Sequence, residues 1–226
     1  PEEVLAIPGV RYAITSNGAM CEDLAEDKVL VRLAMDEETA MRALRIAEKY
    51  DVVIDIYIDG QAYTAADSMR LVQTHVPESF RPYFLKTRRL VEDRGRFLRQ
   101  TGRGAEKFTI LFQDMAQRAA AWKEFEHTGL FELSGGIPEN IEVNAKGVDK
   151  GRALLALAER LGLSRGQTMA CGDASNDLAM LRAAGLGVAM GNATPEAVAA
   201  ADVQTDTNNN DGVAKAIRRW VLCEEV

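Results

Sequence analysis

The stretch Cys171–Met180, CGDASNDLAM, places two acids, a serine and an asparagine between apolar neighbours. It follows the short apolar run TMAC and leads into LAMLRAAG, which has the spacing of a helix. Polar side chains directly after a buried strand lie at its carboxyl end, where open parallel sheets form their ligand sites. We therefore expect Asp173, Ser175, Asn176 and Asp177 to contribute to a site at the end of a sheet.

The last third of the chain alternates apolar runs with helical patterns. GRALLALAERLGL (151–163) repeats its apolar residues every three or four positions, which predicts a helix. TMAC, LGVAM and DVQTD predict short strands, and Thr194-Pro195-Glu196 predicts the start of another helix. Short links between such elements favour parallel strands with helices on both faces. The expected fold is α/β, with a doubly wound, Rossmann-like parallel sheet.

Residues 25–139 have a different pattern. VVIDIYIDGQAYT (52–64) alternates isoleucines with polar residues, which predicts a half-exposed antiparallel strand and a turn at Asp59-Gly60. Asp36 is placed to cap a helix that follows it. We predict an α+β domain over 25–139, inserted into a parallel-sheet domain formed by 1–24 and 140–226. The first residues, Pro1-Glu2-Glu3, have the composition of a helix's first turn.

Composition narrows the class of protein. The net charge is −7 and the isoelectric point is near 5.0, which argues against nucleic acid or an anionic membrane as partner because phosphate contacts need a cationic face. No apolar run reaches the ~20 residues of a membrane span, and no basic leader precedes one. Cysteines 21, 171 and 223 are too far apart for a metal motif. They predict reduced thiols and a cytoplasmic protein. The oligomeric state is left open.

Four polar side chains are expected to converge. Asp173 follows one predicted strand, Asn17 follows YAIT, and Asn192 follows LGVAM, while Lys150 opens a helix. A carboxylate suits a hard dication such as Mg²⁺, and an ammonium group suits phosphate oxygens. Together these groups point to Mg²⁺-assisted phosphoryl transfer. The two histidines, His75 and His127, lie in no catalytic pattern, so zinc or a histidine triad is not expected.

Four patterns then occur in order along the chain: SNGAM (16–20), KGVDKG (146–151), GDASND (172–177) with LAMLRAAGLGVAMGNA, and ADVQTDTNNNDGVAKAI (201–217). In this order they resemble the haloacid dehalogenase-like superfamily, and within it the Cof-type phosphatases, which carry a large α/β cap. The likeness covers about 1–24 and 140–226 at the level of motifs. Over 25–139 it depends on position and on the alternation of strands and helices alone.

The resemblance implies a role for each matching residue. Asp173 matches the acid that binds Mg²⁺, and Asn176 matches the amide that holds the phosphate and the lysine. Asp177 matches the acid that braces this cluster, and Lys150 matches the lysine that neutralises the nucleophile and the phosphoryl group. Asn17 would lie beside the phosphate. The expected catalytic groups are therefore Lys150, Asp173 and Asp177, and the expected substrate is a small phosphorylated metabolite.

Two family motifs have no match in this sequence. The family's nucleophile is the first aspartate of D-x-D-G-T, and YIDGQA (57–62) has Tyr57 where that aspartate would stand. The family's Thr or Ser before Gly-Arg is also absent. We expect both motifs to precede Pro1, as they would if translation had been assigned to an internal methionine. The aspartyl-phosphate of the family mechanism would then form upstream, and these 226 residues alone are expected to hydrolyse little or nothing.

Alternatives remain open at several positions. Asp173, Ser175 or Asn176 could simply cap the next helix, Lys146 competes with Lys150, and Asn17-Gly18 and Asn192 fit ordinary turns. Residues 81–103 hold eight basic and two acidic residues, with Tyr83 and Phe97 available for stacking. This run is either a face for an anionic ligand or a solvated helical surface. The whole chain could also be a truncated, non-catalytic protein that binds a phosphorylated ligand or a partner.

Overall fold

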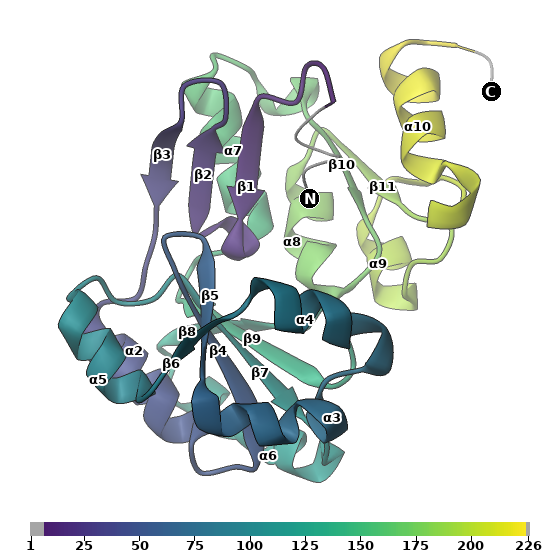
Figure 1. Cartoon of the computed structure of the whole chain (residues 1–226). Coiled ribbons are helices and arrows are strands. Elements are labelled where there is room, and N and C mark those ends of the chain that lie inside the picture. Colours follow the sequence, from purple (N-terminus) through teal and green to yellow (C-terminus); the bar gives the residue numbers. More distant parts are fainter. Residues whose placement is uncertain (1–6, 225–226) are drawn as a thin grey trace. The chain divides into compact units, whose positions relative to one another are not determined.

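The computed structural model describes residues 7–224, so the predicted helical turn at Pro1–Glu3 lies outside the described residues. The chain divides into two compact units, residues 1–148 and residues 149–226. Each contains helices and strands (Figure 1). The predicted α/β class is confirmed.

Unit 1, residues 1–148, begins with a small antiparallel sheet. Its strands are β1 (Tyr12–Thr15), β2 (Met20–Asp23) and β3 (Lys28–Arg32), paired in the order β1-β2-β3. The β1–β2 connection bends through Ser16 and Asn17, whose φ angles of 50° and 58° are left-handed. The expected strand at YAIT is present, but it pairs antiparallel with β2, so its predicted place in the parallel sheet is wrong.

A six-stranded sheet forms the centre of unit 1. Its order is β6-β5-β4-β7-β9-β8, and only the β5–β6 pair is parallel. The bounds are β4 Val52–Ile58, β5 Gln61–Ala65, β6 Arg89–Val91, β7 Lys107–Phe112, β8 Phe131–Ser134 and β9 Asn140–Ala145. The predicted turn at Asp59-Gly60 joins β4 to β5, with both residues at positive φ. Because β9 pairs with β7 and β8, residues 140–145 belong to this sheet, and the division into units falls after Val148, later than the predicted boundary at 140.

One face of the six-stranded sheet carries the main apolar core. Alternate residues of the central strands, including Ile54, Phe108 and Ile141, pack against three helices. These helices are α2 (Glu37–Ala47), α5 (Arg94–Thr101) and α6 (Met115–His127). The α2 helix begins as predicted, because the Asp36 carboxylate accepts a 2.7 Å hydrogen bond from the Thr39 amide.

The opposite face is partly covered by α3 (Val72–His75) and α4 (Arg81–Thr87). Val53 and Leu111 of the sheet pack there against Phe84 of α4. As a result β4 is buried on both faces, and the prediction of a half-exposed strand is wrong. The polar alternation in β4 instead places Asp55 and Tyr57 on the face beside α4, where the side chains of both residues form hydrogen bonds.

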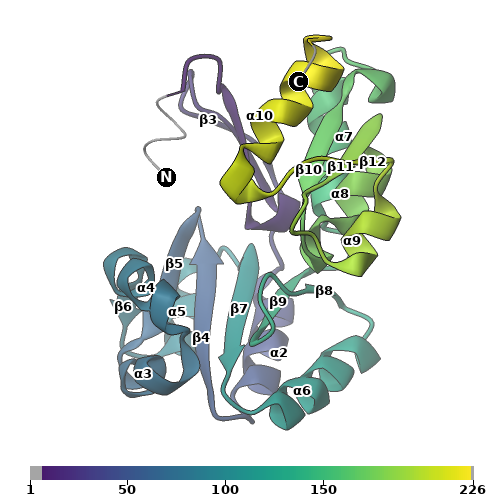
Figure 2. The ribbon, with the colours of Figure 1, turned by 90° about the vertical axis from the view of Figure 1, so that its right-hand side faces the viewer.

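Unit 2, residues 149–226, contains the predicted parallel sheet (Figure 2). The strands β10 (Met169–Gly172), β11 (Leu186–Ala189) and β12 (Val203–Gln204) pair in that order, all parallel. Helix α7 (Lys150–Arg160) precedes the first strand, while α8 (Leu178–Ala183) and α9 (Pro195–Ala200) connect the strands. Helix α10 (Gly212–Ala216) follows the last strand and is extended by a π-helical turn, Ile217–Val221. Thr194 caps α9 as predicted, accepting a hydrogen bond from the Ala197 amide.

Among residues 7–224, no helix has both the length and the apolar character needed to cross a bilayer.

Candidate active site

Asp177 contacts two segments of unit 2 that the sequence analysis placed in the site, the start of α7 and the loop after β10. Its Oδ1 lies 2.7 Å from Nζ of Lys150, at the start of α7. Its Oδ2 accepts hydrogen bonds from the amides of Asp173 and Ala174, at 3.0 and 3.3 Å. The Asp177 residue is only 6% exposed. One buried carboxylate therefore fixes both the lysine and the loop that follows β10.

Two glycines allow these segments to approach so closely. A Cβ on Gly172 would lie 2.5 Å from Cβ of Asp177, and a Cβ on Gly151 would lie 2.4 Å from the carbonyl oxygen of Ala179. Both distances are too short for any side chain. Gly151 thus lets α7 pack against α8, and Gly172 leaves space for the Asp177 carboxylate. The role of these glycines is steric, because neither has a positive φ.

Lys150 begins α7, where a cation opposes the helix dipole. Asp149 compensates as N-cap, because its Oδ1 accepts a 2.8 Å hydrogen bond from the Arg152 amide. The Lys150 side chain is 27% exposed, so its ammonium group remains accessible while bound to Asp177. This position gives the lysine a fixed direction and leaves donor capacity for a further anionic group.

Asp173 is exposed at the carboxyl end of β10 and is held by its neighbours. Its Oδ2 accepts a 3.2 Å hydrogen bond from Asn192, and its carbonyl accepts one from the Thr194 amide at 2.9 Å. The Asn192 side chain also accepts a hydrogen bond from the Asn208 amide, at 3.0 Å. The loops after β10, β11 and β12 thus meet around one exposed carboxylate. The sequence left both convergence with Asp173 and an ordinary turn role open for Asn192, and the structure shows its hydrogen bond to Asp173.

The donor chemistry of this loop cluster fits Mg²⁺. Residues 7–224 hold no group of three or more His, Cys, Asp or Glu side chains arranged for a metal ion. A magnesium site does not need such a group, because Mg²⁺ commonly binds one or two carboxylates and completes its shell with waters and substrate phosphate oxygens. Asp173, exposed and oxygen-bearing, is the side chain suited to that role.

A sequence profile of the haloacid dehalogenase-like hydrolases matches residues 3–217. The chain belongs to this family. It is 47% identical over 116 residues to the 5-amino-6-(5-phospho-D-ribitylamino)uracil phosphatase YcsE of Bacillus subtilis, a match that covers 51% of this chain and 47% of that protein. It is 27% identical over 210 residues to the pyridoxal phosphate phosphatase YbhA of Escherichia coli, covering 91% of this chain and 75% of that protein.

A solved structure supports the same family. A haloacid dehalogenase-like hydrolase from B. subtilis superposes with a TM-score of 0.82 at 25% identity. The superposition covers 96% of this chain and 81% of that structure. The fold of this chain is therefore that of the haloacid dehalogenase-like hydrolases across both of its units.

Three other residues near the predicted site or compared with it, Asn176, Lys146 and Cys171, have different surroundings. Asn176 lies half-buried in the turn between β10 and α8, and no hydrogen bond joins it to Lys150 within the described residues. Lys146, the competitor of Lys150, is an exposed residue of unit 1 that pairs with Glu132 at 3.1 Å. Cys171 is a partly buried residue of β10, and burial raises the pKa of its thiol.

Asn17 lies in unit 1, on the polar side of the six-stranded sheet. Its amide nitrogen is 2.9 Å from Oε2 of Glu142, 3.1 Å from Oδ1 of Asn144 and 3.3 Å from Oγ of Ser134. The expectation that Asn17 follows a parallel strand is wrong, because β1 is antiparallel. The left-handed backbone at Ser16 and Asn17 turns this amide toward β8 and β9 instead.

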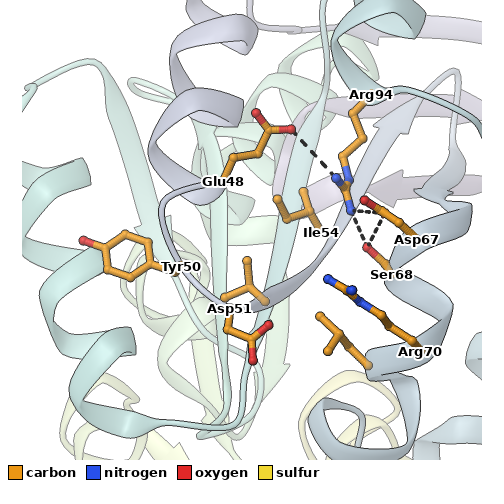
Figure 3. A pocket seen from close by; sticks show the side chains of 10 residues that line it. Glu48, Tyr50, Asp51, Ile54, Asp67, Ser68, Arg70 and Arg94 are labelled. Carbon is orange, nitrogen blue, oxygen red and sulfur yellow. Dashed lines mark hydrogen bonds and ion pairs between the residues drawn. The ribbon is translucent and has the colours of Figure 1, made fainter.

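The basic run 81–103 is largely committed to contacts within unit 1. Arg88 pairs with Asp55 and Arg103 with Asp59, while Arg81 donates to two backbone carbonyls. Arg94 pairs with Asp67 at 3.1 Å and with Glu48 at 3.8 Å inside a cavity of about 240 Å³ (Figure 3). The opposite charges that line this cavity compensate one another. These contacts favour a structural role for much of the run.

Proposed function

We propose that this chain is part of a Mg²⁺-dependent, cytoplasmic phosphatase that hydrolyses the phosphate ester of a small metabolite. Membership of the haloacid dehalogenase-like hydrolases supports this proposal. The observation that carries it is the double contact of Asp177, which holds Lys150 and the loop of Asp173 in one cluster. A fixed ammonium group beside an exposed carboxylate is the arrangement that phosphoryl transfer needs, because positioning and charge neutralisation supply most of its rate.

Each residue of the cluster has one task in this proposal. Asp173 would hold Mg²⁺, and a bound Mg²⁺ would neutralise charge on the phosphate oxygens. Lys150 would donate to those oxygens, held in place by Asp177, and Asn176 would add an amide donor. Asn17 is proposed as a further phosphate-binding side chain. Water would be excluded from the reacting phosphate when the substrate binds.

The nucleophile is proposed to be an aspartate encoded before Pro1. One of its carboxylate oxygens would bond to phosphorus while the bond between phosphorus and the leaving oxygen breaks, and the leaving alcohol would take a proton. Water would then release inorganic phosphate from the aspartyl-phosphate and regenerate the carboxylate. This assignment follows from the absence of a D-x-D-G-T motif in these 226 residues. The chain alone is therefore expected to be inactive.

The test compares the 226-residue chain with a protein extended by the upstream reading frame. Hydrolysis of p-nitrophenyl phosphate is measured with and without Mg²⁺, followed by a panel of phosphate esters that includes pyridoxal phosphate and a phosphorylated ribitylaminouracil. The extended protein is expected to turn over in Mg²⁺ and the shorter chain is not. Lys150→Ala or Asp173→Asn in the extended protein should lower kcat by about 10²–10³-fold, and Lys146→Ala, the matched control, should leave it unchanged.

Activity of the short chain would contradict the upstream nucleophile. An extended protein that is inert on every ester but binds inorganic phosphate through Lys150 would support the non-catalytic binding role instead.

A further inference from the structure

The cavity of about 240 Å³ in unit 1 lies between the α2–β4 connection, the 3₁₀-helical segment Ala66–Leu71 and the start of α5 (Figure 3). Its volume is below the ~300–1,000 Å³ typical of pockets for drug-sized ligands, which suits a smaller molecule. We call it the Arg94 cavity. Its aliphatic lining residues are Val52, Ile54 and Leu71, and its charged lining residues are Glu48, Asp51, Asp67, Arg70 and Arg94.

Arg94 lines this cavity and has one hydrogen-bond donor unused. Its side chain is 10% exposed, and one terminal nitrogen lies 3.1 Å from Oδ1 of Asp67 and donates to the Ser68 hydroxyl. The Nε atom of Arg94 is buried and has no hydrogen-bond partner among residues 7–224. A buried donor without an acceptor costs free energy and is rare in folded proteins. This nitrogen therefore needs an acceptor that the described residues do not supply.

Arg70 brings a second guanidinium group to the cavity. It is an exposed residue, and its side chain forms no hydrogen bond or ion pair within the described part of the chain. Figure 3 shows Arg70 and Arg94 on the same side of the cavity, beside Asp67 and Ser68. Guanidinium groups bind carboxylates through paired N–H donors. This side of the cavity therefore fits a carboxylate.

Two carboxylates on the other side of the cavity retain acceptor capacity (Figure 3). Glu48 lies 3.8 Å from Nη1 of Arg94, a distance that is too long for a hydrogen bond. Burial raises the pKa of Glu48, so a cation beside it would stabilise its charged form. The Asp51 side chain is 64% exposed, and the nearby His75 Nε2 donates to the Asp51 backbone carbonyl at 3.0 Å. Glu48 and Asp51 therefore fit an ammonium group.

The charges of the Arg94 cavity favour a zwitterion over a simple anion or cation. Three carboxylates and two guanidinium groups line it, and Asp67 is already paired with Arg94. Unsatisfied groups of both signs remain, and Glu48 lies only 3.8 Å from Arg94. This short separation matches the adjacent charges of an α-amino acid better than the distant charges of a longer zwitterion.

We propose that the Arg94 cavity is a binding site for a free α-amino acid. Arg70 and Nε of Arg94 hold its carboxylate, and Glu48 and Asp51 hold its ammonium group. The volume admits a short side chain, as in alanine or serine. The lining residues all belong to unit 1, so the site is independent of the proposed phosphatase activity.

The test titrates glycine, L-alanine and L-serine into the 226-residue chain by ligand-observed NMR. Acetate and methylammonium are probes with one charge, and γ-aminobutyrate is a probe with separated charges. At least one α-amino acid is expected to bind with a Kd on the order of 1 mM, and about threefold or more tighter than each comparison probe. Binding of no α-amino acid, or equal or tighter binding of any comparison probe, would overturn the proposal.

Variants locate the binding. Arg70→Ala and Glu48→Gln change partly or fully exposed side chains, so the fold should be kept, and each should weaken the amino acid by about three- to tenfold. Arg96→Ala, the matched control, changes an exposed arginine of α5 outside the cavity and should leave the affinity unchanged. Equal affinity in the wild type and Arg70→Ala would contradict the assignment.

Arg94→Lys tests the unused donor, because it keeps a positive charge and removes Nε. It should weaken amino-acid binding by about tenfold or more. An unchanged affinity in a folded Arg94→Lys protein would show that Nε does not hold the carboxylate. If this variant fails to fold, the comparison of Arg70→Ala with Arg96→Ala decides the proposal.

Discussion

The two main sheets place their charged groups differently. In the six-stranded sheet of unit 1, Asp55, Lys107 and Glu142 lie along one face and pair across strands or with Arg88. In the parallel sheet of unit 2, Asp173 and Asp177 both follow the end of β10. Unit 1 thus spreads its charges over a surface that helices partly cover, whereas unit 2 gathers them in loops at one edge.

Because of this difference, removing the partner of a charged group should lower the free energy of unfolding by different amounts in the two units. Asp55 is fully buried and depends on Arg88, and its second oxygen has no hydrogen bond among the described residues. Asp177 keeps two amide donors even without Lys150. We therefore expect unit 1 to be the more sensitive to charge removal. The sequence has two tryptophans, Trp122 in unit 1 and Trp220 in unit 2, so fluorescence of single-tryptophan variants reports the unfolding of each unit.

The largest effect is expected for Arg88→Ala. It should lower the free energy of unfolding of unit 1 by about 3–5 kcal/mol, because it leaves a buried carboxylate without its cation. Lys150→Ala should cost unit 2 about 1 kcal/mol or less, since that lysine is partly exposed and Asp177 retains its amide bonds. Urea unfolding followed by tryptophan fluorescence measures both. A double variant, Arg88→Ala with Asp55→Ala, should recover part of the loss, and equal costs in the two units would remove the contrast.

The next effect depends on pH. Burial raises the pKa of Asp55 to about 6, and Arg88 opposes that rise. Because this pKa is above the unfolded value, the contribution of Asp55 to stability is fully present below pH 4 and falls as the pH rises through 6, by about 3 kcal/mol. The difference in unfolding free energy between the wild type and Asp55→Asn should therefore shift against the wild type from pH 4 to pH 7. A constant difference across this range would show that Asp55 stays ionised.

A pair of helical glycines should respond with opposite signs. Gly151→Ala should destabilise unit 2 by about 1–3 kcal/mol, because its Cβ would meet the Ala179 carbonyl. Gly95→Ala in α5 should stabilise unit 1 by about 0.5–1 kcal/mol, since its Cβ would make only ordinary contacts with Arg99 and Met41. Thermal and urea unfolding of the two variants measure both changes in the free energy of unfolding. Stabilisation by Gly151→Ala would mean that α7 and α8 pack less closely than described.

The smallest effect is expected at the surface of unit 2. A hydrogen bond from Lys215 at 2.7 Å, together with the Thr207 amide, lowers the pKa of Asp206 to about 2. The charged form therefore stabilises the fold above pH 4, and this contribution is lost as the pH falls through 2. Asp206→Asn should lower Tm slightly at pH 7, less in high salt because the pair is exposed. A loss that is unchanged by salt would indicate a role other than this ion pair.

The same contrast explains what could be predicted from the sequence. The motif of unit 2 is local: Asp173 and Asp177 lie within five residues, and the strand, loop and helix around them follow from spacing and caps. The choice of Lys150 over Lys146 also agrees with the contact to Asp177. The charged cluster of unit 1 combines positions 55, 88, 107 and 142, which are far apart in the sequence and meet only through the pairing of β4, β7 and β9 and the contact of Arg88 with Asp55. No local pattern marks them, apart from the polar alternation in β4, which predicted an exposed face that α3 and α4 cover.

The strand that precedes Asn17 was hard to place for a related reason. The residues SNGAM gave the right turn but not its direction, because the pairing of a short strand such as YAIT depends on whether the next strand returns beside it. Here β2 does so after four residues.

Arg88 joins two layers of unit 1 through one side chain. Its guanidinium group pairs with the buried Asp55 of β4 and lies against the rings of Phe80, Tyr83 and Phe84. A change at this one position would therefore disturb the sheet and the helix beside it together.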